Sequence, residues 1–199
     1  TGEALSEEMP LAIAAEIKLS QTPGVVVTHL SPSSMIEAIA ARHNSSVVRT
    51  PVGQAYISEA MLEHNAVLGG EGNGAVAIPE IHATNDSAAT IGLILEYLAK
   101  TGKKISELAA SLPRFTMLKH YVAVAPNKLF SVLSEIRVEA ETAGAGEIDL
   151  SDGVKLIWPD GWLHIRASNT ESMIRLIAEA GSETRAEELL AWARDQIKM

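Results

Sequence analysis

Short apolar runs alternate with segments of helical periodicity in the first half of the chain. We predict strands over residues 25–30, 46–50, 66–68 and 74–81. Helices are predicted over residues 8–19, through Ile36, Ile39 and Ala40, over 57–64 and over 87–100. The helix over 87–100 is apolar on most faces, which predicts that it is buried. Short apolar strands that alternate with helices are typical of a mainly parallel sheet in a three-layer α/β domain.

The pattern changes near Leu112-Pro113-Arg114. Predicted strands follow over 117–125, 154–158, 162–167 and 173–180, with a helix over 128–139. A closing helix begins at Ser182, with Thr184 and Glu187 at the spacing of a capping box. Strands joined by tight turns and flanked by two helices predict a smaller α+β domain with an antiparallel sheet. We therefore predict two domains, residues 1–115 and 116–199.

Composition and charge exclude several classes of protein. With 47% hydrophobic and 21% charged residues, the chain is not intrinsically disordered. The 25 acidic residues outnumber the 16 basic ones, and there are only two phenylalanines, three tyrosines and three tryptophans. Nucleic-acid binding needs a dense basic face or a stacking platform, so no nucleic-acid partner is expected. The apolar stretch over 91–99 is too short for a bilayer, so no membrane partner is expected either.

The chain contains no cysteine, which excludes a disulfide framework and a cysteine metal site. This agrees with a cytoplasmic location, and no secretory signal is visible. The first residue is Thr1 rather than methionine, so we expect the chain to be a fragment of a longer protein.

A glycine-rich loop follows the third predicted strand, at the edge of the sheet where ligands of α/β proteins collect. It reads Gly69-Gly70-Glu71-Gly72-Asn73-Gly74. Glycine allows close approach of the backbone to a ligand, while a carboxylate and an amide suit sugar hydroxyls. The alternative is an ordinary turn with an exposed Glu71.

A second candidate loop runs from Arg166 to Arg175, between two predicted strands. Symmetric pairing places Ala167 opposite Ile174 and Arg166 opposite Arg175. Two like charges in that position are destabilising unless an anion lies between them. The loop adds hydroxyl, amide and backbone N–H donors that suit a phosphate. The alternative is a solvated hairpin whose arginines pair with Glu171 and Glu179.

No complete catalytic apparatus is visible, and we predict neither catalytic nor metal-binding residues in this chain. The six histidines are scattered without the spacing of metal ligands. His82 and Asp86 are four residues apart, but an ordinary loop contact is the favoured interpretation.

The two loops together resemble the α-D-phosphohexomutase superfamily, which includes phosphoglucomutases, phosphomannomutases and phosphoglucosamine mutases. Gly70 to Gly74 is similar to the family's sugar loop, Gly-Glu-x-Ser/Asn-Gly, and Arg166 to Arg175 to its phosphate loop, Arg-x-Ser-x-Thr-Glu-Pro-x-x-Arg. Thr50-Pro51-Val52-Gly53 also resembles a segment upstream of the sugar loop. The resemblance covers essentially all of the chain, as the third and fourth of four domains.

The resemblance implies a role for each loop. The sugar hydroxyls would be bound by the first loop, and the phosphate that is not transferred by the second. The implied substrate-binding residues are Gly70, Glu71, Gly72, Asn73, Arg166, Ser168, Asn169, Thr170 and Arg175. The implied reaction is phosphoryl transfer between an enzyme phosphoserine and a hexose phosphate, through a hexose 1,6-bisphosphate and with Mg²⁺.

Three positions depart from the family pattern. Ser172 replaces the usual proline of the phosphate loop, Asn85 replaces a frequent arginine, and Ala55 lies where several relatives have a basic residue. The phosphoserine loop and the aspartate-rich Mg²⁺ loop have no counterpart in the sequence.

We therefore interpret the chain as the C-terminal half of a phosphohexomutase, which binds sugar phosphate but is inactive without the N-terminal domains of the same protein. Its Mg²⁺ ligands would lie outside the fragment. Two alternatives stay open: a free-standing phosphosugar-binding or regulatory module, and a structural domain pair with degenerate loops.

Overall fold

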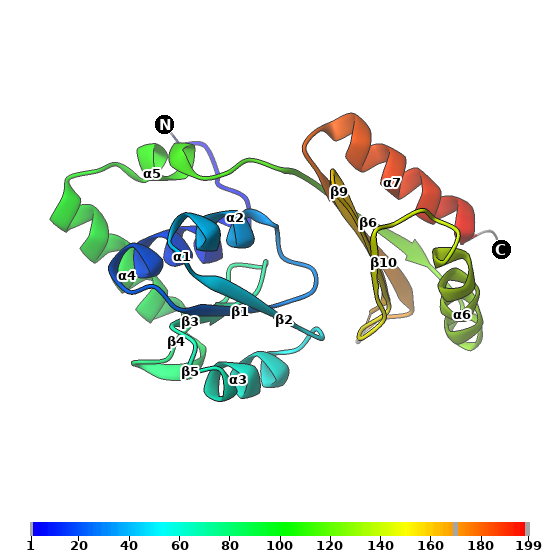
Figure 1. The fold of residues 1–199 in the computed structure, drawn as a ribbon, viewed down its shortest axis with the longest axis horizontal. Helices are drawn as coiled ribbons and strands as arrows, with labels where there is room; N and C mark the ends of the chain where they lie inside the picture. Colours follow the sequence, from blue (N-terminus) through cyan, green and yellow to red (C-terminus); the bar gives the residue numbers. More distant parts are fainter. Residues whose placement is uncertain (1, 169–170, 198–199) are drawn as a thin grey trace. The chain divides into compact units, whose positions relative to one another are not determined.

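The computed structural model describes residues 2–168 and 171–197. The chain forms two compact units, residues 1–114 and residues 115–199 (Figure 1). We call them the first and second units.

The first unit is built on a five-stranded sheet with the order β2-β1-β3-β4-β5. Strands β1 and β2 pair in parallel, as do β1 and β3, whereas β4 and β5 are antiparallel additions. The strands are β1 Val25–His29, β2 Ser46–Thr50, β3 Leu68–Gly70, β4 Val76–Ile78 and β5 His82–Asn85. The mainly parallel sheet confirms the predicted class of this part of the chain.

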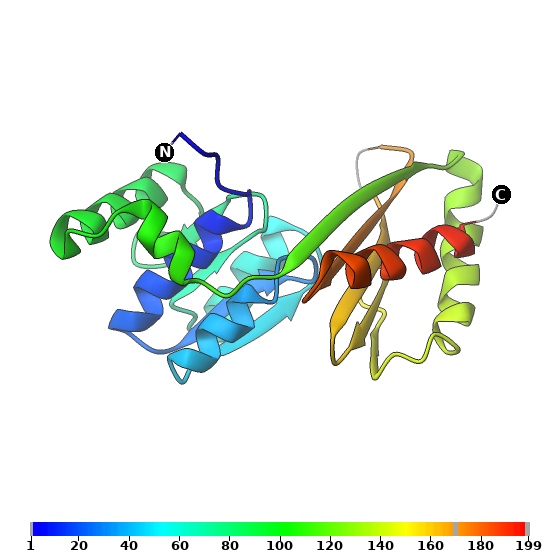
Figure 2. The ribbon, with the colours of Figure 1, turned by 90° about the horizontal axis from the view of Figure 1, so that it is seen from above.

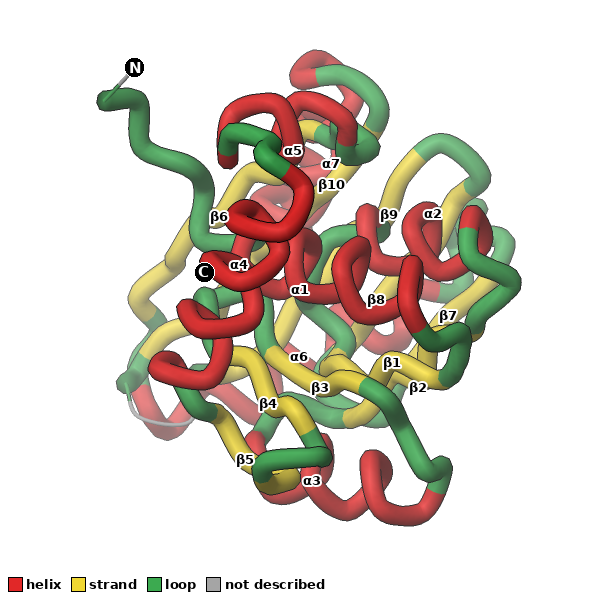
Figure 3. Tube along the Cα trace, turned by 90° about the vertical axis from the view of Figure 1, so that its left-hand side faces the viewer, coloured by secondary structure: helices red, strands yellow, loops and turns green. Residues whose placement is uncertain are grey.

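Helices cover both faces of this sheet, which makes three layers (Figure 3). Val26 belongs to a core with α1, α2, α4 and α5, while its neighbour Val27 packs with α3. Side chains alternate between the faces of a strand, so successive valines fill separate cores. The helices are α1 Met9–Gln21, α2 Met35–Arg42, α3 Gln54–Glu63, α4 Ser87–Thr101 and α5 Ile105–Ser111.

The second unit is an antiparallel sheet with the order β6-β10-β9-β8-β7. Both of its described α-helices pack on one face of the sheet (Figure 2), where Ile136 and Leu190 join the core formed by Leu156, Ile165 and Leu176. The elements are β6 Thr116–Ala123, the 3₁₀ helix η1 Pro126–Lys128, α6 Leu129–Ala140, β7 Glu147–Asp149, β8 Val154–Trp158, β9 Gly161–Ala167, β10 Met173–Ala180 and α7 Glu183–Gln196. The predicted α+β class is confirmed.

Two predictions about helices are wrong, and the His82–Asp86 contact, which was interpreted as an ordinary loop contact, begins in strand β5. Helix α4 is not buried, because only one face of it packs on the core: Ile91 and Leu95 are 58% and 59% exposed. At α7 the cap is Ser182, whose side chain accepts a hydrogen bond from the Arg185 N–H, in place of the predicted Thr184–Glu187 box. Among the described residues, no helix combines the length and the apolar character needed to cross a membrane.

Candidate functional site

The glycine-rich loop is the turn of the hairpin between β3 and β4. The Glu71 N–H donates to the Ala75 carbonyl at 2.8 Å, which continues the pairing of the two strands. Asn73 closes the turn, since its Oδ1 accepts the Ala75 N–H at 3.0 Å. Its Nδ2 donates to Glu71 Oε2 at 3.1 Å. The amide therefore holds both the turn and the carboxylate.

Glu71 is held at its second oxygen as well. Asn85 at the end of β5 donates from Nδ2 to Glu71 Oε1 at 3.4 Å. The ring Nε2 of His29 at the end of β1 lies 3.8 Å from Glu71 Oε2. The Glu71 side chain is 17% exposed, so the alternative of an exposed glutamate in an ordinary turn is wrong. The carboxylate is preorganised to accept hydrogen bonds from hydroxyl groups.

A buried glutamate explains the glycine at position 72. Glu8, which is 7% exposed, accepts the Ser33 N–H at 3.1 Å. A Cβ at position 72 would lie 2.5 Å from Glu8 Oε2, closer than real Cβ atoms approach their neighbours. Gly70 is similarly restricted, because its Cβ would meet the Ala75 carbonyl oxygen at 2.5 Å. The backbone of the neighbouring strand thus requires glycine at position 70, whereas a side chain at position 72 would displace the Glu8 carboxylate.

The second candidate site lies on the hairpin of β9 and β10. Arg166 is directly opposite Arg175, and Ala167 is opposite Ile174, as the sequence predicted. The Ser168 N–H donates to the Met173 carbonyl at 2.9 Å and extends the pairing by one step. Both arginines alternate with core residues such as Leu176. They therefore belong to the face of the sheet opposite α6 and α7.

The two arginines have different partners. Arg166 Nε donates to Asp152 Oδ2 at 3.3 Å, and the Arg166 side chain is 5% exposed. Arg175 Nη2 lies 3.5 Å from Ser168 Oγ and 3.9 Å from Glu171 Oε2, and its guanidinium is 5.8 Å from the ring centre of Tyr121. Arg175 Nε is buried without a hydrogen-bond partner among the described residues. A cation with incomplete hydrogen bonding next to a second cation suits a multidentate anion.

The remaining predicted residues have mixed outcomes. Asn169 and Thr170 lie outside the described residues. Glu179, one of the two acids proposed to pair with the arginines, accepts the indole N–H of Trp162 at 2.9 Å. Sequence reasoning missed Glu8, His29 and Asp152. His29 could have been found from the expected parallel pairing of the first and third strands. In the structure this pairing places Thr28 opposite Gly70, so His29 and Glu71, the residues that follow them, lie close together.

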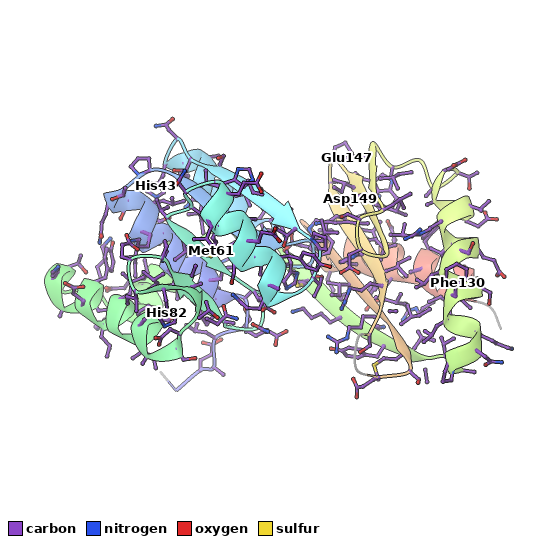
Figure 4. The ribbon with its side chains drawn as sticks, turned by 90° about the horizontal axis from the view of Figure 1, so that it is seen from below. His43, Met61, His82, Phe130, Glu147 and Asp149 are labelled. Carbon is purple, nitrogen blue, oxygen red and sulfur yellow. The ribbon has the colours of Figure 1, made fainter. Side chains whose placement is uncertain are left out.

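Within residues 2–168 and 171–197, no group of three or more histidine or acidic side chains is placed to hold a metal ion. His82 Nε2 lies 3.1 Å from Asp86 Oδ2, and Asp86 caps α4 by accepting the Ala89 N–H at 2.9 Å. This backbone hydrogen bond and the His82 contact lower the pKa of Asp86. Figure 4 shows His43 well apart from His82 in the first unit, in agreement with separate structural roles.

Comparison with known proteins gives matches over both units. Residues 7–115 match the model of the phosphoglucomutase/phosphomannomutase alpha/beta/alpha domain III, and residues 120–196 match that of the C-terminal domain of the same proteins. The chain is 37% identical over 190 residues to a phosphoglucomutase/phosphomannomutase of Thermococcus kodakarensis, covering 95% of the chain and 41% of that protein. It is 31% identical over 183 residues to a probable phosphoglucosamine mutase of Methanopyrus kandleri, covering 92% of the chain and 40% of that protein.

A solved structure has the same fold. A crystal structure of a phosphoglucomutase/phosphomannomutase family protein from Burkholderia thailandensis superposes with a TM-score of 0.83 at 23% identity, covering 99% of the chain and 42% of that structure. At this identity the likeness shows the fold alone. The chain thus spans about two-fifths of the length of the relatives it matches.

Proposed function

The chain belongs to the phosphoglucomutase/phosphomannomutase family, of which it carries the third and fourth domains, and we propose that it supplies the sugar and phosphate recognition of a phosphohexomutase. The whole protein would interconvert hexose 1-phosphates and hexose 6-phosphates through a phosphoserine and a hexose 1,6-bisphosphate. The names of relatives support a sugar-phosphate substrate, including glucosamine phosphates for some of them. We place the protein in the cytoplasm.

The proposed recognition is divided between the two loops. Glu71 accepts hydrogen bonds from sugar hydroxyls, and Asn73 makes a second contact with the sugar. Gly70 and Gly72 allow the backbone of the loop to pack closely. Arg166, Ser168 and Arg175, with Asn169 and Thr170, bind the phosphate that is not transferred. Binding and orientation of this kind lower the barrier to phosphoryl transfer by positioning the reacting group and by compensating its charge.

The family's Mg²⁺ does not fit the described residues, which offer no cluster of metal ligands. We therefore assign no step in this chain to the ion and expect its ligands in the other domains of the whole protein. The 199-residue chain by itself is expected to bind substrate without turning it over.

The observation that carries the proposal is the direct opposition of Arg166 and Arg175 across the hairpin. Opposed like charges destabilise a strand pair. Arg166 has the Asp152 carboxylate at 3.3 Å, whereas the carboxylate of Glu171 lies 3.9 Å from Arg175 and the Glu171 side chain is 56% exposed. A bound phosphate would compensate the charge of the opposed arginines and provide an acceptor for Arg175 Nε, which has no hydrogen-bond partner among the described residues.

We expect Arg175→Ala to weaken binding of glucose 1-phosphate by about 30-fold, which corresponds to about 2 kcal/mol, because charge-assisted hydrogen bonds are lost. Isothermal titration calorimetry of the chain with glucose 1-phosphate, inorganic phosphate and glucose provides the measurement. Inorganic phosphate is expected to lose affinity as well, whereas glucose is expected to be unaffected.

Arg194→Ala is the matched control. Arg194 lies on α7, on the opposite face of the same sheet, where it contacts Glu187 and His120. The control removes the same charge from the same unit and should leave the affinity for glucose 1-phosphate within about twofold. Equal affinities for the unaltered chain and Arg175→Ala would contradict the proposed phosphate site.

A further inference from the structure

The segment that follows β1 is fixed by a single arginine of the neighbouring strand. Arg49 Nη1 donates to the His29 carbonyl at 2.9 Å and to the Pro32 carbonyl at 2.7 Å, and Nη2 donates to the Ser33 carbonyl at 3.3 Å. The same guanidinium is held by both carboxylate oxygens of Glu37, each at 2.8 Å. Bidentate pairing of this kind fixes the geometry of the donor group. The backbone of His29 is therefore held in place at the carboxyl edge of the sheet.

The His29 side chain has a defined orientation as well. Its Nδ1 accepts the Ser31 N–H at 3.1 Å. In the neutral imidazole an accepting Nδ1 leaves the ring proton on Nε2. That atom is the one that lies 3.8 Å from Glu71 Oε2, and the His29 and Glu71 side chains are only 10% and 17% exposed.

The contact between His29 and Glu71 is electrostatic, because 3.8 Å exceeds the length of an N–H···O hydrogen bond. Attraction between an N–H dipole and a carboxylate is stronger in a partly buried position than in water. Glu71 Oε2 thus accepts a hydrogen bond from Asn73 and is attracted by His29, while Glu71 Oε1 accepts a hydrogen bond from Asn85. Together these three side chains come from three different parts of the first unit and define where the carboxylate lies.

We propose that His29 is a positioning residue for sugar recognition, which acts by holding the Glu71 carboxylate in the orientation that accepts hydrogen bonds from the sugar. This inference rests on the proposed function. A carboxylate that is fixed before binding loses less conformational entropy when the ligand arrives, so its contribution to affinity is larger. Without the imidazole, Glu71 is held by two amides and can leave this orientation.

The test compares His29→Leu with His29→Gln in calorimetric titrations of the 199-residue chain. Glucose 1-phosphate and inorganic phosphate are the two probes. We expect His29→Leu to weaken glucose 1-phosphate binding about fivefold or more and to leave inorganic phosphate within about twofold. Glutamine has an N–H donor at a similar distance from the backbone, so His29→Gln is expected to restore most of the affinity.

His64→Leu is the control for replacing a histidine by leucine, because His64 is an exposed residue at the end of α3. It should bind both probes as the unaltered chain does. Equal binding of glucose 1-phosphate by His29→Leu and the unaltered chain would overturn the inference and leave the proposed function intact. A parallel loss of inorganic phosphate binding in both His29 variants would also overturn it, since that indicates general damage. If the unaltered chain binds inorganic phosphate but discriminates no sugar phosphate, the sugar site and this inference both fail.

Discussion

Replacement of Gly153 by alanine is expected to destabilise the second unit by about 3 kcal/mol, a large fraction of the stability of a typical domain. Gly153 has a φ of +77°, which side chains other than glycine adopt only with strain. A Cβ there would also clash with the Ile165 carbonyl oxygen and lie 2.9 Å from the Arg166 Cα. These are backbone atoms of a central strand, so they cannot move aside as a side-chain tip could. Strain and overpacking therefore add.

Gly144→Ala measures the destabilisation that comes from backbone strain alone, so the difference between it and Gly153→Ala gives the contribution of the steric clash at Gly153. Gly144 has a similar φ of +70°, but a Cβ there would meet nothing within 4 Å. We expect Gly144→Ala to cost about 1 kcal/mol. All three tryptophans of the chain lie in the second unit, so urea unfolding followed by tryptophan fluorescence reports on that unit. Equal destabilisation by the two substitutions would contradict the packing assigned to Gly153.

Gly153→Ala is also expected to weaken the binding of inorganic phosphate. Gly153 follows Asp152, whose carboxylate holds Arg166 Nε at 3.3 Å. A shift of this segment away from β9 moves the carboxylate that orients Arg166. Gly144→Ala does not disturb that contact, so it should keep the affinity of the unaltered chain for inorganic phosphate.

The periodicity of the sequence predicted most of the fold because each apolar position has a defined partner layer. Val26 and Val27 fill the cores on opposite faces of one sheet, and a run of β-branched residues encodes such a strand directly. Helix α4 was predicted to be buried because apolar side chains occur all around it. Burial also requires a partner on each face, and Ile91 and Leu95 face away from the core formed by the described residues. Composition alone does not contain that information.

The candidate site was predictable where its residues are neighbours in sequence. Glu71 and Asn73 share one turn, and Arg166 and Arg175 are brought together by a hairpin that the alternation of side chains indicates. His29, Glu8 and Asp152 were not predicted, because each reaches its partner through pairing or packing between distant segments. Their positions depend on strand register and on loop conformation, which a single sequence does not fix.

The second unit is expected to lose about 3 kcal/mol of stability as the pH falls from about 6.5 to about 4. The cause is His164, a fully buried residue whose Nε2 donates to the Asp152 carbonyl at 2.7 Å. Burial lowers the pKa of His164 from 6.5 to about 4. Below pH 6.5 the unfolded chain takes up a proton that the folded unit does not bind until about pH 4. The unfolded state is therefore favoured progressively across this window, and the loss levels off below it.

His164→Gln isolates this contribution, because glutamine does not titrate and has an N–H donor for the Asp152 carbonyl. The measurement is the free energy of unfolding from urea titrations with tryptophan fluorescence, at pH values between 4 and 8, for both proteins. Carboxylates of the fold titrate in part of the same window, but they are common to both proteins and cancel in the difference. We expect the unaltered chain to lose about 3 kcal/mol more than His164→Gln on acidification. Parallel pH profiles would show that the His164 imidazole is protonated without cost inside the sheet, which contradicts its burial as a neutral group.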